Sequence, residues 1–174
     1  MHSAQPKFSL SVLSRIYVAS IILWGVLVLI GLFGLRLSLR EGILFGIGGM
    51  LIHWVSNLFH HLGHIIAAHS TGYPMSGLRI GTHGSFLGTD VYPENEPALP
   101  LRTHVRRALG GPITSLLLST VFGVMTYALS RGAHSVGYWL AGFGLAENFL
   151  FYFAQAILPL GFNDGAVVWR YLLQ

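Results

Sequence analysis

This chain has few charged residues and no cysteine. Only 9% of its 174 residues are charged, against about 25% in an ordinary soluble domain, and it has no cysteine. The shortage of charge, with 53% hydrophobic residues and a mean hydropathy of +0.63, indicates a membrane protein. The lack of cysteine excludes disulfides, thiolate metal sites and haem bound covalently through C-x-x-C-H. The net charge of +4 is scattered, so nucleic-acid binding is not expected.

Long uncharged segments predict how the chain crosses the membrane. About twenty apolar residues, at about 1.5 Å rise each, cross a hydrocarbon core of about 30 Å. We therefore predict an all-α membrane protein with about four transmembrane helices. The predicted helices are 16–35, 42–68, 110–129 and 136–158. Pro112 favours a helix that begins at residues 110–112, because proline is well placed in a first helical turn.

The chain divides into an N-terminal segment with an anchor helix, residues 1–41, and a membrane domain, residues 42–174. Within that domain, residues 69–108 form the one long polar connection. Glycines punctuate short segments at 85–87 and 89–92, which predicts a small β hairpin between the second and third helices.

Basic residues predict the orientation in the bilayer. Four spans place both termini and the 69–108 loop on one side of the membrane. That side holds seven of the ten Lys and Arg residues: Lys7, Arg15, Arg79, Arg102, Arg106, Arg107 and Arg170. The positive-inside rule then predicts that this side is cytoplasmic, in an integral, multi-pass protein.

The second predicted span carries a polar stripe. Five of its side chains fall within a sector about 100° wide on a helix. They are His53, Asn57, His60, His61 and His64. Polar side chains at membrane depth normally face a bundle interior or a wet cavity, whereas the alternative is an amphipathic helix on the membrane surface. His60 and His64 are four residues apart, so both imidazoles can reach one metal ion.

Three motifs follow one another along residues 42–174. They are H-H-x-x-H at 60–64, R-x-x-x-G-P-x-x-S at 107–115 and P-x-x-x-x-D-G at 159–165. In this order the chain resembles the site-2 protease family of intramembrane zinc metalloproteases. The resemblance implies three zinc ligands and a segment that binds a substrate or partner. The implied ligands are His60, His64 and Asp164, and the implied binding residues are Gly111, Pro112 and Ser115.

Two positions depart from the family pattern. His61 stands where the family has its general-base glutamate, and Ser115 stands where it has an asparagine. His61 is a candidate replacement base, but an imidazole beside a divalent cation is a poor proton carrier. Alternatively His61 is a fourth ligand, and a closed shell of that kind is typical of structural metal sites. We predict that the chain does not hydrolyse peptide bonds.

His53 and Glu147 are the other candidate polar residues at membrane depth. Counted along their helices at about 1.5 Å per residue, they lie at similar depth. We therefore expect a buried His53–Glu147 pair, with a protonated glutamate bonded to a backbone carbonyl as the alternative.

Three functions remain open from the sequence. The first is a site-2-protease-like pseudoprotease that keeps a divalent metal, zinc by preference, and binds a transmembrane protein partner in the bilayer. The second is an active intramembrane zinc metalloprotease with a non-standard base. The third is an accessory subunit of a larger membrane complex whose histidines ligate haem or a chlorophyll-type pigment. In the plainest reading, the histidines only join helices by hydrogen bonds.

Overall fold

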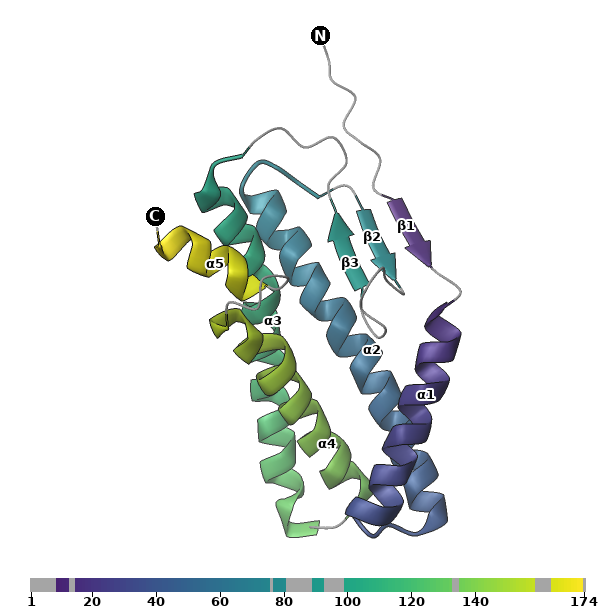
Figure 1. The fold of residues 1–174 in the computed structure, drawn as a ribbon. Coiled ribbons are helices and arrows are strands. Elements are labelled where there is room, and N and C mark those ends of the chain that lie inside the picture. Colours follow the sequence, from purple (N-terminus) through teal and green to yellow (C-terminus); the bar gives the residue numbers. More distant parts are fainter. Residues whose placement is uncertain are drawn as a thin grey trace.

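The computed structural model describes residues 9–12, 15–75, 77–80, 89–92, 99–132, 135–158 and 164–173. Four helices in this part of the chain are long and apolar enough to cross a membrane, as predicted (Figure 1). They are Ile16–Gly34, Leu39–Ser70, Leu101–Leu129 and Val136–Ile157. Their outward faces carry many exposed apolar side chains, which suits a lipid bilayer.

The first and fourth spans change helical geometry along their length. The first is α1 (Arg15–Leu29), continued by a π-helical turn η1 (Ile30–Gly34). The fourth is α4 (Val136–Ala146), then a π-helical segment η3 (Glu147–Phe153) and a 3₁₀ turn η4 (Ala154–Ile157). A last helix, α5 (Asp164–Leu172), lies near the C-terminus.

The central helix, α2 (Leu39–Ser70), begins three residues before its predicted start. A capping box explains this, since Ser38 N donates to Glu41 Oε2 over 3.0 Å and Glu41 N donates to Ser38 Oγ over 3.4 Å. At the other end, Gly72 has φ +79°, the left-handed conformation that ends many helices.

The third helix, α3 (Leu101–Leu129), corrects the prediction that Gly110–Pro112 opens it. Pro112 instead lies inside the helix. A proline normally disfavours helical geometry in the residue before it, because its ring meets that residue's Cβ. Gly111 has no Cβ, so the helix passes through, and residues 101–108 become helical instead of extending the loop.

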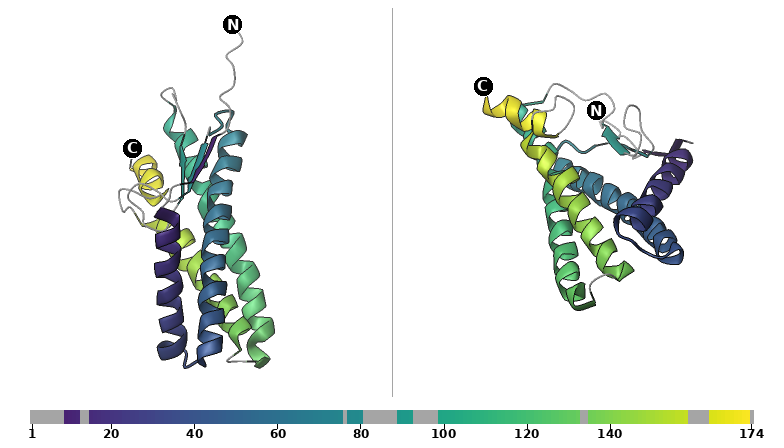
Figure 2. Two further views of the ribbon diagram at one scale, coloured as in Figure 1. Left: turned by 90° about the vertical axis from the view of Figure 1, so that its right-hand side faces the viewer. Right: turned by 60° about the horizontal axis from the view of Figure 1, so that its bottom comes forward.

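Glycines let the neighbours of α2 approach closely. Figures 1 and 2 show α1 on one side of α2, with α3 and α4 on the other. Gly46 and Gly49 face α1, whereas a Cβ on Gly48 would lie 2.8 Å from Leu140 of α4. A Cβ on Gly63 would lie 2.9 Å from the carbonyl carbon of Gly110, so α2 and α3 almost touch by their backbones there.

Three short strands lie at the same end of the bundle as α5 (Figure 1). They are β1 (Ser9–Val12), β2 (Gly77–Ile80) and β3 (Thr89–Tyr92), in the order β1-β2-β3. The β2–β3 pairing is antiparallel and only four residues long, so the expected hairpin is no extended element. The segments 81–88 and 93–98 lie outside the described residues. β1, which pairs parallel to β2, was not predicted.

The interior is polar where α2 meets α3 and η3. Among the described residues, buried polar or charged side chains outnumber buried apolar ones. The polar set is His53, Ser56, Asn57, His60, His64, Arg107, Ser115, Ser119, Glu147 and Asn148. The polar stripe of α2 therefore faces the bundle, which argues against the alternative of a helix on the membrane surface.

Candidate metal centre

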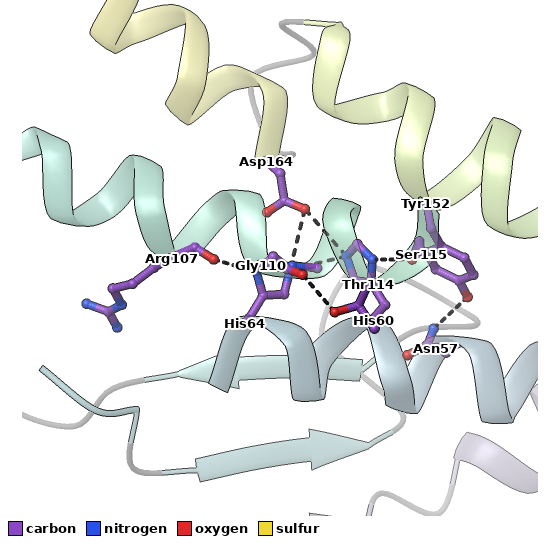
Figure 3. Close-up of polar contacts among 10 residues, drawn as sticks. Asn57, His60, His64, Arg107, Gly110, Thr114, Ser115, Tyr152 and Asp164 are labelled. Carbon is purple, nitrogen blue, oxygen red and sulfur yellow. Dashed lines mark hydrogen bonds and ion pairs between the residues drawn. The ribbon is translucent and has the colours of Figure 1, made fainter. Parts of the chain in front are cut away.

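His60 and His64 meet Asp164 where α2, α3 and α5 converge (Figure 3). The Nε2 atoms of the two histidines are 3.1 Å apart, and Oδ2 of Asp164 lies 3.4 Å from each. The histidines are only 3% and 7% exposed, and the aspartate side chain is 20% exposed. The fold thus brings together three possible ligand atoms, although His60 and Asp164 are 104 positions apart in the sequence.

The spacing of these atoms fits one small metal ion. A point equidistant from all three lies about 1.9 Å from each, close to the 2.0–2.1 Å of zinc–nitrogen bonds. A tetrahedral ion with bonds of that length separates its ligands by about 3.3–3.4 Å. Three protein atoms would then occupy three corners and leave the fourth open.

Each histidine is oriented through its other ring nitrogen. Nδ1 of His64 donates to the carbonyl oxygen of Arg107 over 2.8 Å, and Nδ1 of His60 lies 2.9 Å from the hydroxyl of Ser115. Imidazoles that ligate metals almost always donate their second nitrogen in this way, which leaves the Nε2 lone pair for the ion. Ser115, expected to bind substrate or partner, is therefore placed behind a candidate ligand.

Gly111 leaves the space that an ion would take. A Cβ added at Gly111 would lie 2.6 Å from Nε2 of His60 and even closer to Nε2 of His64. Any other residue would fill the point where the two nitrogens converge. Gly111 and its neighbour Pro112 are both buried, and the partner-binding role expected for them stays a prediction.

Asp164 is held in place through the rest of α5. A Cβ on Gly165 would lie 2.6 Å from the carbonyl oxygen of Gln155, so α5 packs directly on η4. Trp169 Nε1 donates to the carbonyl oxygen of Ile157 over 2.6 Å. Pro159, at the start of the third motif, lies outside the described residues.

The charge of Asp164 suits a metal ligand. Burial alone would raise the pKa of its carboxyl group, but the interactions with the neighbouring His60 and His64 side chains outweigh burial and hold the pKa well below its usual range. Asp164 lies outside the four candidate spans, near one end of the bundle. The carboxylate therefore stays ionised at neutral pH.

His61 lies beside the three ligand atoms. Its ring centre is 5.3 Å from that of His60 and 5.7 Å from that of His64. It is not among the three residues whose ligand atoms all lie within 4.8 Å of one another. Its Nδ1 is buried and has no hydrogen-bond partner in the described part of the chain. Both roles considered for His61, base and fourth ligand, stay predictions.

Tyr152 is a neighbour of the centre that the sequence did not suggest. Its ring lies 5.1 Å from the ring of His60, tilted by 35°, and its hydroxyl accepts from Asn57 Nδ2 over 3.0 Å. Tyr152 follows Glu147 by five residues, which on an α-helix is about 140° round the axis. The sequence therefore gave no reason to place both on the face toward α2.

His53 and Glu147 come together deeper in the bundle. Nδ1 of His53 lies 2.5 Å from Oε1 of Glu147, and their side chains are 10% and 8% exposed. At the next residue of η3, Asn148 Nδ2 donates over 2.8 Å to the hydroxyl of Ser56, which lies one turn along α2 from His53. Polar pairs thus join α2 to η3 from mid-span towards the candidate metal centre.

Comparison with family models, with curated proteins and with solved structures finds no match to this chain.

Proposed function

We propose that this chain is a site-2-protease-like integral membrane protein that holds one divalent ion, zinc by preference, at His60, His64 and Asp164. We further propose that it is a catalytically impaired pseudoprotease that binds a transmembrane protein partner. The observation that carries the metal site is the triangle of ligand atoms, 3.1–3.4 Å on each side, around the space left by Gly111.

The residues around the ion divide into those that hold it and those that orient the holders. Zinc, when bound with an open position, lowers the pKa of a bound water to about 7. His60, His64 and Asp164 would hold it, while Ser115 and the Arg107 carbonyl keep the two imidazoles in one orientation. A hydrolase also needs a group that takes the water's proton and passes it to the leaving amine. The family's carboxylate is replaced by His61, which supports impaired hydrolysis.

The same geometry favours a single ion over haem or a chlorophyll-type pigment. A macrocycle held by both histidines at once would need its ring between the two nitrogens. Here the two Nε2 atoms are 3.1 Å apart and share one carboxylate oxygen. There is no room between them for the ring.

One observation favours the active-protease alternative. Nδ1 of His61 is buried, unpartnered among the described residues and beside both candidate ligands, so a proton acceptor is available near the centre. An experiment on cleavage has to separate this reading from the pseudoprotease.

The first experiment tests the metal site. The purified protein, loaded with Zn²⁺ and washed, is analysed for bound metal as wild type, Gly111→Ala and Gly123→Ala. Both glycines lie in α3, but a Cβ on Gly123 meets only Leu145, at an ordinary 3.7 Å. We expect one equivalent in wild type and Gly123→Ala and none in Gly111→Ala. Absence of metal from the folded wild type would refute the proposal.

The second experiment tests hydrolysis with a model transmembrane peptide. His61→Glu restores the family's base, and His69→Glu, at an exposed histidine of the same helix, is the control. Metal in all three proteins with cleavage only by His61→Glu supports the pseudoprotease. Cleavage by wild type that is lost in His60→Ala would instead establish an active protease.

A further inference from the structure

The π-helical segment η3 presents its polar residues to α2 in an unusual register. Residues 147 and 152 are five apart on η3, and their partners on α2, residues 53 and 57, are four apart. An α-helix would turn Glu147 and Tyr152 about 140° away from each other. A π-helix joins residues i and i+5 by hydrogen bonds, so it brings residues five apart to nearly the same face.

This register has a consequence at the candidate metal centre. Glu147 meets His53. One π turn later, Tyr152 meets Asn57 and lays its ring against His60 (Figure 3). His60 is then bounded by the Ser115 hydroxyl at Nδ1 and by the Tyr152 ring on one face. Such π turns occur frequently at functional sites.

We propose that Tyr152 is a positioning residue for the metal ligand His60, and that η3 is the element that brings it there. The Asn57 amide fixes the Tyr152 hydroxyl, and the ring limits how far the His60 imidazole can tilt away from the ion. This inference rests on the proposed metal centre and adds to it a residue that is not one of the three candidate ligands.

The size of the effect follows from what is known of groups behind metal ligands. Removing a residue that orients a ligand typically lowers metal affinity 10–100-fold. A freed imidazole also changes the symmetry of the ligand field. Co²⁺ in the same site reports both the affinity and the symmetry of the ligand field, because its visible absorption depends on coordination geometry.

The test compares Co²⁺ affinity and visible spectrum in full-length protein as wild type, Tyr152→Leu, Tyr152→Phe and Phe151→Leu. Phe151→Leu is the matched control, since it removes the same kind of ring from the same segment at a residue that is 74% exposed. We expect Tyr152→Leu to weaken Co²⁺ binding about 10–100-fold and to alter the spectrum. Tyr152→Phe keeps the ring and should recover most of the affinity, and Phe151→Leu should match wild type.

The outcomes separate this inference from the proposed function. If the folded wild type binds no Co²⁺, the metal centre itself fails. If wild type binds and Tyr152→Leu matches Phe151→Leu in affinity and spectrum, the positioning role is overturned while the centre stands.

A second variant covers the case in which Tyr152→Leu does not fold. Asn57→Ala removes the tether and leaves the ring, so it should weaken Co²⁺ binding less than Tyr152→Leu would. Its effect should not add to that of Tyr152→Phe, because the two changes break one hydrogen bond. Unchanged Co²⁺ affinity in Asn57→Ala, or full additivity, would contradict the proposal.

Discussion

Single residues behind and between the candidate ligands shape the centre as much as the ligands do. His60 and His64 bring nitrogen atoms, but Gly111 provides the space where these converge. Ser115 and the carbonyl of Arg107 decide which nitrogen of each ring faces that space. Two of these contributions come from a missing side chain and a backbone atom, so side-chain chemistry alone does not describe the site.

Ser115→Ala tests the hydrogen bond behind His60. Without the hydroxyl, Nδ1 of a buried imidazole loses its partner, and Zn²⁺ affinity should fall about 10–100-fold in a competition with a chelator. Ser119→Ala is the control, because Ser119 is equally buried one turn along α3 but donates only to the carbonyl of Leu116. Equal affinities in the two variants would contradict the role given to Ser115.

His53→Leu tests the deeper pair through the free energy of unfolding in detergent. It leaves the Glu147 carboxylate buried without its imidazole, and breaking such a pair costs about 3–5 kcal/mol. Adding Glu147→Gln removes the uncompensated charge and should recover most of that loss. If the double variant is no more stable than His53→Leu, a charge on Glu147 does not account for the lost free energy of unfolding.

Among the elements, the short helix α5 matters to the centre because of where it begins. It carries one candidate ligand at its first residue, and its position depends on the contact of Gly165 with the carbonyl oxygens of η4. The helix is also tied to η4 by Trp169. We therefore expect a change at this contact to displace Asp164 together with the helix.

Gly165→Ala should displace α5, because the new Cβ would lie within 2.9 Å of the carbonyl oxygens of Gln155 and Ala156. We expect Zn²⁺ affinity to fall at least about tenfold, since a carboxylate moved by an ångström no longer completes the triangle. The readout is chelator competition. Gly142→Ala is the control, since nothing lies within 4 Å of its Cβ, and wild-type affinity in Gly165→Ala would refute the coupling.

At the scale of the whole molecule, four candidate spans put β1 and α5 at one end of the bundle (Figure 1). The candidate metal centre lies near that end, whereas the His53–Glu147 pair lies deeper between the helices. The positive-inside rule predicts that the end with the centre is cytoplasmic.

The absence of native cysteine makes this orientation directly testable. Ser70 and Ser130 are exposed residues at opposite ends of the bundle, at the ends of α2 and α3. In cells, we expect a membrane-impermeant thiol reagent to modify Ser130→Cys from outside and to modify Ser70→Cys only after the membrane is opened. The reverse pattern would invert the predicted topology.

Much of the architecture was predictable because hydropathy is a local property. Uncharged runs located all four spans, and the i, i+4 spacing identified His60 and His64 as partners. The start of α3 was predicted wrongly, because a proline such as Pro112 usually signals the start of a helix. Here the residue before it is a glycine, which has no Cβ to clash with the proline ring. β1 was missed because a four-residue strand has too little pattern of its own to stand out from a polar segment.

By itself, the sequence predicted the four spans and the His60–His64 pair, because these depend on composition or on short-range spacing, whereas Asp164 was a candidate only through the resemblance to a protease family. Only the tertiary structure decided that Asp164 reaches the two imidazoles, that Gly111 leaves room between them and that Tyr152 packs on His60. These relations join residues on different helices. They arise from how closely α2 and α3 approach and from the π-helical register of η3, and neither is encoded in any one segment of the chain.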